Sequence, residues 1–412
     1  MELKNISKTF CAAPFVHMYV AKGEQRICCQ TTEYIPTNRL TELDLEKRWQ
    51  SDYYKTIRQQ FLDGEEPVKC TKCFTTEKHN GISDRMNYNA RYQDILLETN
   101  VETGNKYNSP IDLELRPGNL CNLKCRMCGP QSSSQLEKEQ SQNPELFRGY
   151  GAVIEAEEIY SEKNLNFLLK NIDKGQHIKF LGGEPTIMPE VGDILDRLIK
   201  TNNTNVPIHI TTNCTNTTEQ FMDKIKQFTR ISFNYSIDGT GKVVEYIRNP
   251  VKFKTIEKNM KLYHKMAMGR GNISFAFQAY NLFNLYDTIK WAADLGVLVH
   301  ANLVDDPEWC SILCVPKEIR DAELTKTKQL MLSDDKYIEW ITNQTSGIVP
   351  AIDRILADDR EFGMAHLARN TKILDKVRKQ HMKDYIPELW KIIKEEYNQQ
   401  SIEYIRNFTS MR

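Results

Sequence analysis

The chain has 412 residues, of which 40% are hydrophobic and 27% charged, a composition typical of globular proteins and not of disordered ones. Its 55 lysines and arginines balance 55 aspartates and glutamates, so no net charge attracts it to nucleic acid or to an anionic membrane, and neither is an expected partner. The first residues, MELKNISKTF, lack the apolar core of a signal peptide, and no apolar run is long enough to span a bilayer, so a cytoplasmic location is expected.

Length and cysteine content indicate several domains and metal binding. A chain of 412 residues is too long for one ordinary core, and we expect an N-terminal module over 1–105, a middle domain over 106–315 and a helical region over 316–412. The eleven cysteines are not expected to form disulfides in a reducing compartment. Seven of them stand in tight groups, the spacing typical of metal ligands: Cys28, Cys29, Cys70, Cys73, Cys121, Cys125 and Cys128.

The N-terminal segment predicts a small α+β module. FVHMYV and QRICC are typical of two strands of a hairpin, turned at Lys22–Gly23. The stretch LTELDLEKRWQSDYYKTIRQQFLDGE predicts one amphipathic helix, and the polar stretch NVETGNKYNSP predicts a linker after the module. The apolar side of that helix would carry Leu43, Leu45, Trp49 and Ile57.

Four cysteines of this module fit a closed metal site. The set that fits best is Cys11, Cys28, Cys70 and Cys73. Cys29 is spare, because adjacent residues on a strand point to opposite faces. Two alternatives stay open: the site is a zinc ribbon, or His17 or His79 replaces one of the cysteines.

The middle domain alternates strand-like and helix-like segments. Six short segments, most of them rich in Ile, Phe or Val, predict strands: IDLELRP from Ile111, IKFLGG from Ile178, PIHITTN from Pro207, ISFNYSID from Ile231, ISFAFQAY from Ile273 and VLVHANLV from Val297. Helical patterns such as VGDILDRLIK and TIEKNMKLYHKM lie between them. The alternation predicts an α/β fold, a partial (β/α)6 TIM barrel with its chemistry at the C-terminal ends of the strands.

A cysteine triplet follows the first of these strands. LCNLKCRMCGP places Cys121, Cys125 and Cys128 in a C-x3-C-x2-C loop. Three thiolates on one compact loop can hold three irons of a cubane cluster and leave the fourth iron open, as a catalytic site requires. The alternatives are a zinc site, for which no fourth ligand lies nearby, or three unrelated buried cysteines.

At this point the chain resembles the radical S-adenosylmethionine superfamily, whose members carry C-x3-C-x2-C in a partial TIM barrel. The resemblance covers about residues 110 to 305, because FLGGEP, TTN, SIDGT and EYIRNP follow the cysteines in the family's order. Each motif alone has an ordinary explanation as a turn or a solvated charge. Their ordered recurrence after successive strands is what makes them informative.

The resemblance implies roles for individual residues. Gly182 and Gly183 would let the backbone approach a ligand closely, and Glu184 would help to hold the methionine ammonium. Arg248 would pair with the methionine carboxylate, as in the peptide-modifying branch. Further residues near S-adenosylmethionine would be Thr212, Asn213, Ser236, Asp238, Gln278 and Asn281.

The implied chemistry is reductive cleavage of S-adenosylmethionine. The cysteine triplet would hold a 4Fe-4S cluster, and an electron from a donor such as flavodoxin or ferredoxin would yield methionine and a 5′-deoxyadenosyl radical that abstracts hydrogen. Met127 stands where the family often has an aromatic residue, and its apolar side chain is expected to shield the cluster as well.

Hairpin, helix and C-x2-C resemble the SPASM/twitch module, which carries an auxiliary 4Fe-4S cluster in many peptide-modifying radical enzymes. That module usually follows the barrel, whereas here it precedes it. We therefore expect oxidative modification of a peptide or protein, by crosslinking, dehydrogenation or epimerisation. Two alternatives stay open: the same chemistry on a small molecule such as a sugar, nucleotide or amine, and a non-catalytic iron–sulfur or zinc protein.

Cys310 and Cys314 follow the last predicted strand and are predicted as catalytic thiols that would donate hydrogen to a substrate radical. Ordinary buried thiols are the alternative, and we favour the oxidative route because the N-terminal segment is otherwise unexplained. In the C-terminal region, LWKIIKEEYNQQSIEYIRNF predicts a packing face rather than a membrane helix. Its apolar positions at helical spacing are Leu389, Ile392, Ile393 and Tyr397.

Overall fold

The computed structural model describes residues 7–21, 24–31, 35–36, 44–78, 82–98, 109–143, 159–172, 176–342 and 348–409. These belong to two compact units. The first unit comprises 1–120, 153–211 and 218–232, and the second comprises 121–152, 212–217 and 233–412. The N-terminal segment therefore shares a unit with the first strands of the middle domain, and the division into domains 1–105, 106–315 and 316–412 stays a prediction. The predicted linker and the Lys22–Gly23 turn fall mainly outside the described residues.

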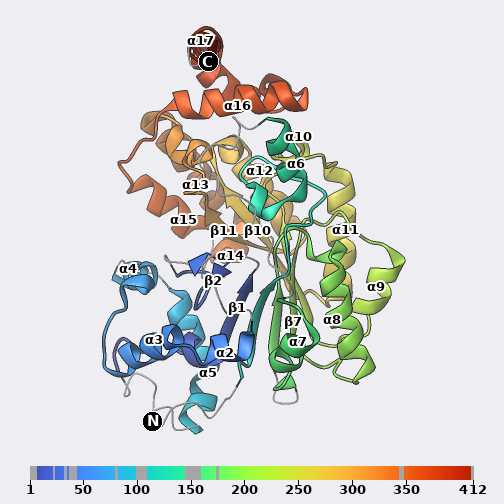
Figure 1. The fold of residues 1–412 in the computed structure, drawn as a ribbon. Helices are drawn as coiled ribbons and strands as arrows, with labels where there is room; N and C mark the ends of the chain where they lie inside the picture. Colours follow the sequence, from blue (N-terminus) through green and yellow to red (C-terminus); the bar gives the residue numbers. More distant parts are fainter. Residues whose placement is uncertain are drawn as a thin grey trace. The chain divides into compact units, whose positions relative to one another are not determined.

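All six predicted strands of the middle domain are present. They are β4 (Asp112–Arg116), β6 (His177–Phe180), β7 (Ile208–Thr212), β8 (Ile231–Ser236), β10 (Gly271–Phe277) and β11 (Leu298–Leu303). Helices follow most of them, as in a βαβ fold, so the α/β class is confirmed (Figure 1).

The N-terminal segment adds a seventh parallel strand. β1 (His17–Ala21) pairs in parallel with β4, from His17 opposite Asp112 to Ala21 opposite Arg116. In the first unit the strand order is β3-β2-β1-β4-β6-β7-β8, with β2 (Glu24–Gln25) and β3 (Ile35–Pro36) antiparallel. Residues 233–236 of β8 belong to the second unit, in which the strand order is β8-β10-β11. The two strand orders together comprise seven parallel strands, one more than predicted, and the described strands close neither order into a barrel.

Alternating burial explains the sheet of the first unit. Leu113 and Leu115 on β4, and Ile178 and Phe180 on β6, are fully buried on one face. α8 (Pro189–Lys200) buries a matching apolar stripe, with Val191, Ile194, Leu195 and Leu198 at helical spacing. The opposite face of β4 is charged and nevertheless buried, because Asp112 is paired with His17 Nδ1 at 2.7 Å and Glu114 with Arg116 at 3.2 Å.

The long helix predicted in the N-terminal module is two helices. α2 (Leu45–Trp49) begins after Asp44, whose side chain accepts from the backbone N–H groups of Glu46 and Lys47. α3 (Asp52–Leu62) begins after Ser51. Leu45, Trp49 and Ile57 are buried as predicted, whereas Leu43 lies outside the described residues. The remaining elements of the first unit include α1 (Ala13–Val16), η3 (Val68–Cys70), α4 (Thr71–Lys78), α5 (Asp84–Glu98), α7 (Glu162–Leu168), η8 (Pro185–Ile187) and α9 (Glu219–Ile225).

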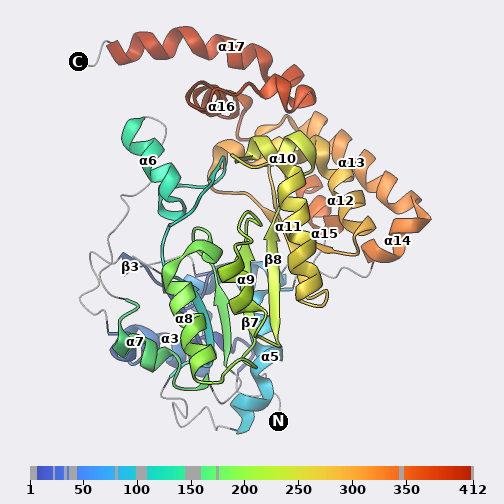
Figure 2. The same ribbon diagram turned by 90° about the vertical axis from the view of Figure 1, so that its right-hand side faces the viewer.

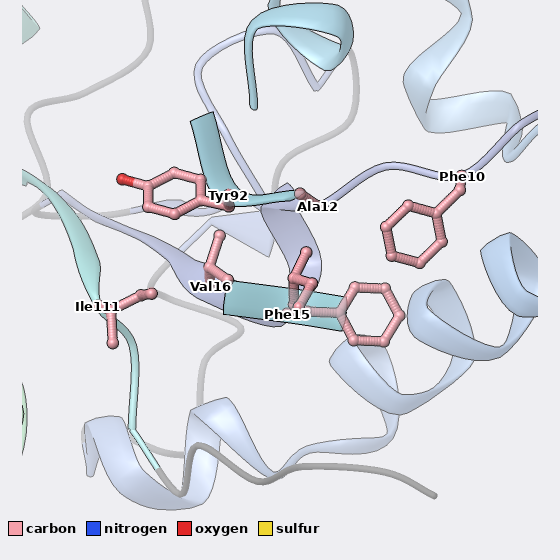
Figure 3. Packing of buried hydrophobic residues seen from close by; sticks show 7 residues of the cluster. Phe10, Ala12, Phe15, Val16, Tyr92 and Ile111 are labelled. Carbon is pink, nitrogen blue, oxygen red and sulfur yellow. The ribbon is translucent and has the colours of Figure 1, made fainter. Parts of the chain in front are cut away.

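A hydrophobic cluster fixes the N-terminal segment onto α5 and the entry to β4 (Figure 3). Phe10 and Phe15 stack with ring centroids 5.2 Å apart, and Val16 lies beside them in the same cluster. Tyr92 and Leu96 contribute from α5. Burying each of these large side chains contributes roughly 1.5–3 kcal/mol, so the cluster holds the segment that carries Cys11.

The second unit is helical around its strands. Its elements include β5 (Lys124–Cys125), η5 (Pro130–Ser132), α6 (Ser134–Gln142), α10 (Gly241–Ile247), β9 (Arg248–Asn249), α11 (Phe253–Met266), η9 (Ala279–Asn284), α12 (Leu285–Asp294), η10 (Glu308–Cys310), η11 (Ile312–Cys314), α13 (Lys317–Ser333), α14 (Asp335–Thr342), α15 (Ile348–Leu356), α16 (Met364–Arg378), η12 (Met382–Asp384) and α17 (Pro387–Thr409). The predicted packing face of α17 is confirmed at Leu389, Ile393 and Tyr397, which are buried where α17 lies beside α16 (Figure 2). Among the described helices, none combines the length and apolar character needed to cross a membrane.

Candidate active site and a second cysteine site

The cysteine triplet lies on a loop of the second unit that is pinned by a short two-stranded sheet. β5 pairs antiparallel with β9, so that Cys125 stands opposite Arg248. The backbone N–H of Arg126 extends this pairing by donating to Ile247 O at 2.8 Å. The N–H of Cys128 donates to Cys125 O at 3.2 Å and closes the turn between them. The turn therefore brings Cys125 and Cys128 of the predicted triplet together.

Arg248 connects this loop to Asp238. Its Nε donates to Asp238 Oδ2 at 2.6 Å, and its Nη1 lies 3.8 Å from Cys125 Sγ. Asp238 is fully buried and also accepts from the backbone N–H of Ala276 at 2.8 Å. Arg248, predicted to face a ligand carboxylate, is thus already held by a carboxylate of the chain, beside Cys125.

The electrostatics of the triplet are uneven. The Cys128 thiol, which hydrogen-bonds Cys125, and the nearby Arg248 guanidinium lower the pKa of Cys125 despite its burial. The same hydrogen bond and burial raise the pKa of Cys128. Asp238 and the cysteines outweigh the effect of burial on Arg248, so the pKa of its guanidinium is raised and it stays charged. A permanent cation therefore lies beside Cys125, where it stabilises a thiolate.

Asn213 reaches the triplet from the end of β7. Its Nδ2 donates to Asn122 Oδ1 at 3.0 Å and lies 4.0 Å from Cys121 Sγ. Its Oδ1 accepts from the N–H of Thr215 at 3.0 Å, which fixes the amide orientation. Thr212 is buried, and its Oγ1 accepts from the N–H of Cys214 at 3.1 Å. Of these two predicted site residues, Asn213 is therefore the one that lies against the cysteine loop.

Gln278 and Asn281 follow β10 and cap η9. Asn281 Oδ1 accepts from the N–H of Gln278 at 2.9 Å, and its Nδ2 donates to Asp238 O at 3.0 Å. Gln278 Nε2 donates to Ala276 O at 3.2 Å, and the side chains of Gln278 and Asn281 form a capping box at the start of η9. Ser236 ends β8 opposite Ser274 of β10. Among these strand-end side chains, Gln278 and Asn281 are fully buried.

The glycine motif belongs to the first unit and packs against its own unit's chain. Gly182 has a φ of +118°, which favours glycine, and a Cβ at Gly183 would lie 2.3 Å from Leu120 O. Glu184 is fully buried, and its Oε1 accepts from Thr186 Oγ1 at 2.6 Å. The backbone of residues 118–120 can therefore approach this closely only because residues 182 and 183 have no side chain. The motif alone did not indicate this reason for the two glycines.

The predicted catalytic thiols are buried and engaged with their own loop. Cys310 Sγ donates to Pro307 O at 3.4 Å, and Cys314 Sγ donates to Glu308 O at 3.1 Å. Burial raises the pKa of Cys310, and burial together with Glu308 raises the pKa of Cys314 to about 12. Both groups are therefore neutral thiols at neutral pH, a form that can donate hydrogen.

The first unit contains the second cysteine site. Cys11, Cys28, Cys70 and Cys73 line one pocket, whose wall also includes Ala13, Ile27, Phe61 and Tyr88. These four cysteines are the set chosen from their spacing. Cys29 is not part of the wall; it lies near Glu114 and is influenced by its charge.

Polar contacts hold the four cysteines around this pocket. Arg85 of α5 pairs with Glu77 of α4 and donates to Phe10 O at 2.8 Å, so it ties the helix of Cys73 to the segment of Cys11. Asn89 reinforces that segment, since its Oδ1 accepts from the N–H of Ala12 at 2.7 Å. Gln30 Nε2 donates to Asp84 Oδ2 at 2.6 Å and ties the turn of Cys28 to α5.

Both cysteine groups fit iron–sulfur clusters by donor chemistry. Within the described residues, no three histidine, cysteine, aspartate or glutamate side chains converge on a single metal ion. The N-terminal cysteines instead surround a pocket, as the thiolates of a four-iron cluster must, because each binds a different iron. His17 does not line this pocket; its Nδ1 is bonded to Asp112, and His79 lies outside the described residues.

Sequence reasoning missed three polar residues within the triplet loop. Asn122 pairs with Asn213, Lys124 with Glu139 at 3.0 Å, and Arg126 with Asp375 at 2.6 Å. Their position in the sequence could have indicated them, because polar and charged residues between closely spaced cysteines need hydrogen-bond or ion-pair partners wherever the loop is buried.

Residues 115–292 match a family model described as the Radical SAM superfamily. Similar solved structures include anSMEcpe with bound AdoMet, at 17% identity and a TM-score of 0.41, covering 55% of this chain and 61% of that one. Streptococcus suis SuiB bound to S-adenosylmethionine is 15% identical, with a TM-score of 0.34 and coverage of 62% and 52%. SuiB bound to precursor peptide SuiA is 12% identical, with a TM-score of 0.34 and coverage of 77% and 66%.

The chain thus spans 61% and 52% of the lengths of the first two of these proteins. No curated protein matches it in sequence.

Proposed function

We propose that this protein, an enzyme carrying a radical SAM domain over residues 115–292, cleaves S-adenosylmethionine at a cluster held by Cys121, Cys125 and Cys128 and oxidatively modifies a peptide or protein. The observation that carries the proposal is the paired β5–β9 sheet, which sets Arg248 opposite Cys125 within the matched residues. The 4Fe-4S cluster supplies the electron that breaks S-adenosylmethionine into methionine and a 5′-deoxyadenosyl radical.

The residues of the protein would bind and orient S-adenosylmethionine. Arg248, fixed by Asp238 at 2.6 Å, would present its charge to the methionine carboxylate beside the cluster. Gln278, a fully buried amide just after β10, would contact the adenosyl group. Asn213 supports the loop of Cys121, and Gly182, Gly183, Glu184, Thr212 and Ser236 complete the predicted set.

We further propose an auxiliary 4Fe-4S cluster in the N-terminal pocket, in a module of the SPASM/twitch type. Its support is that the four cysteines chosen from spacing all line one pocket. With four cysteine ligands no iron would be left open for S-adenosylmethionine, so the role that fits is to accept the electron of the substrate radical. This is the basis for an oxidative outcome.

The substrate class follows from that module. Auxiliary clusters of this type, and an arginine placed like Arg248, resemble those of peptide-modifying radical enzymes. A peptide or protein is therefore the substrate we propose, with flavodoxin or ferredoxin as the electron donor.

The test combines metal analysis with product mass. Anaerobically reconstituted protein should hold about eight irons, and a Cys70→Ala/Cys73→Ala variant about four, because only the N-terminal site is emptied. Stoichiometric zinc in the N-terminal site would overturn the auxiliary cluster and leave the catalytic one standing.

Product analysis uses wild-type protein, S-adenosylmethionine, a reductant and a pool of peptides. We expect 5′-deoxyadenosine and a peptide product lighter by two hydrogens. Turnover of a sugar, nucleotide or amine, with peptides unchanged, would replace the peptide substrate with a small molecule.

A further inference from the structure

Arg126 is a cation inside the cysteine loop, next to Cys125, and its side chain is fully buried. A buried guanidinium needs a compensating charge and hydrogen bonds; Nε and Nη2 of Arg126 have partners, whereas Nη1 has none among the described residues. Arg126 Nε donates to Tyr246 O at 3.0 Å, and its guanidinium carbon lies 3.5 Å from the centre of the Tyr246 ring. The charge itself is balanced by Asp375 of α16, whose Oδ1 lies 2.6 Å from Arg126 Nη2.

Asp375 also accepts hydrogen bonds from three further elements of the second unit. Its Oδ1 also accepts from Tyr246 Oη at 2.6 Å. Its Oδ2 accepts from the N–H of Met382 at 2.9 Å and from Tyr397 Oη at 3.3 Å. One buried carboxylate therefore joins α10, η12 and α17 to the loop of the cluster cysteines.

A second ion bridge connects α16 to the other side of Cys125. Lys124 Nζ contacts Glu139 Oε1 at 3.0 Å, and Arg378 Nη2 contacts Glu139 Oε2 at 2.7 Å. Glu139 and Arg378 are buried, so these charges are held in a low dielectric and constrain one another strongly. The two cations that flank Cys125 are thus both connected to the end of α16. Arg126 pairs directly with Asp375, and Lys124 is connected to Arg378 through Glu139.

We propose that Asp375 is a positioning residue of the active site: through Arg126 it sets the path of the cysteine loop, so that α16 and α17 complete the catalytic cluster site. The inference rests on the proposed function of Cys121, Cys125 and Cys128. It gives the C-terminal helices a role that their sequence did not indicate, and it explains why a cation stands within the cysteine motif.

Asp375→Asn in the full-length protein tests the role, because the amide keeps the shape and removes the charge. We expect the variant to fold and to keep the metal of its N-terminal site, while iron attributable to the triplet falls at least twofold. The change that S-adenosylmethionine causes in the electron paramagnetic resonance spectrum of the reduced cluster should weaken, and KM for S-adenosylmethionine should rise about tenfold.

Asp353→Asn is the matched control. Asp353 is also a helical carboxylate paired with a cation, Lys328, at 2.5 Å, but it is about half exposed. Its variant should keep wild-type iron content, spectrum and KM. If Asp375→Asn behaves like this control, the proposal is wrong.

A double variant distinguishes loss of the Arg126–Asp375 ion pair from a general loss of protein stability. Arg126→Gln/Asp375→Asn leaves no buried charge unpaired, so its iron content should be no lower than that of either single variant. Independent, additive losses would overturn the claim that Asp375 acts through Arg126.

Tyr397→Phe covers the case in which Asp375→Asn does not fold. It removes one hydrogen bond to Asp375 and keeps the ring, so we expect a folded protein with a smaller change in the same spectrum. An unchanged spectrum in Tyr397→Phe would then contradict the proposal. If instead the wild-type protein binds no cluster at the triplet, the proposed function itself fails, which is a distinguishable result.

Discussion

The two cysteine groups differ in what surrounds their sulfur atoms. In the triplet, Arg248 Nη1 lies 3.8 Å from Cys125 Sγ and Asn213 Nδ2 lies 4.0 Å from Cys121 Sγ. The N-terminal pocket is lined by apolar side chains such as Ile27 and Phe61 and also by Thr31 and Arg85, with Thr31 Oγ1 3.7 Å from Cys28 Sγ. Burial is the largest cause of the raised pKa of each of its thiols: Cys11, Cys28, Cys70 and Cys73.

The hydrogen bond from Cys128 and the Arg248 guanidinium lower the pKa of Cys125, whereas burial raises the pKa of every thiol in the N-terminal pocket. Under the proposed function, the triplet would hold the cluster that meets a charged ligand, and the four-cysteine pocket would hold a closed cluster. Hydrogen bonds to sulfur and exposure to solvent set the potential of a cluster, so the two sites should differ in potential.

The largest effect is expected from removing the triplet. Replacing Cys121, Cys125 and Cys128 with alanine should remove about four irons and abolish 5′-deoxyadenosine, while the N-terminal site keeps its metal. Iron analysis and chromatography of the reaction mixture measure both. A variant that still cleaves S-adenosylmethionine would remove the distinction between the two sites.

Next in size is Arg248→Ala, which removes the guanidinium whose Nη1 lies 3.8 Å from Cys125 Sγ. A charge-assisted hydrogen bond contributes about 1.5–3 kcal/mol, so the dissociation constant for S-adenosylmethionine should rise about ten- to a hundredfold. Isothermal titration of the iron-loaded protein measures it. Arg360→Ala is the control, because Arg360 forms a comparable pair with Asp358 at 2.6 Å but is exposed. Equal affinities in the two variants would show that Arg248 does not bind the ligand.

Two glycine substitutions test whether close packing at Gly183 supports residues 118–120, which precede the triplet. Gly183→Ala places a Cβ 2.3 Å from Leu120 O, and such overpacking should cost about 1–3 kcal/mol of unfolding free energy. Gly192→Ala on α8 has its nearest neighbour at 3.5 Å, the flexible end of Lys224, and should stabilise by about 0.5–1 kcal/mol. Urea unfolding distinguishes the opposite signs. A neutral Gly183→Ala would mean that the 118–120 backbone can move aside.

The smallest effect is expected at Cys310 and Cys314. If the N-terminal cluster accepts the electron of the substrate radical, Cys310→Ala and Cys314→Ala should leave turnover unchanged within about twofold. The product should lack two hydrogens and take up no deuterium from solvent. Loss of turnover with intact S-adenosylmethionine cleavage, and a product of unchanged mass that carries deuterium, would instead assign hydrogen donation to a thiol.

Much of the fold and of both cysteine groups followed from the sequence alone. The six strands of the middle domain were predicted because runs rich in β-branched and aromatic residues between helical patterns are local signals. That Cys11, Cys28, Cys70 and Cys73 line one pocket agrees with the grouping predicted from their spacing. The order of motifs after successive strands predicted the family domain, because parallel strands bring their carboxyl ends to one edge.

Only the tertiary structure decided which distant segments meet. The apolar period of β1 marks a strand but not its partner, so its parallel pairing with β4 was not predicted. A helical pattern continuous through Gln50–Ser51 likewise hid the break between α2 and α3. Arg126 and Asp375 are 249 positions apart, and nothing local marks either as the other's partner. Buried charges acquire their partners through packing, and packing is a property of the folded chain rather than of any segment.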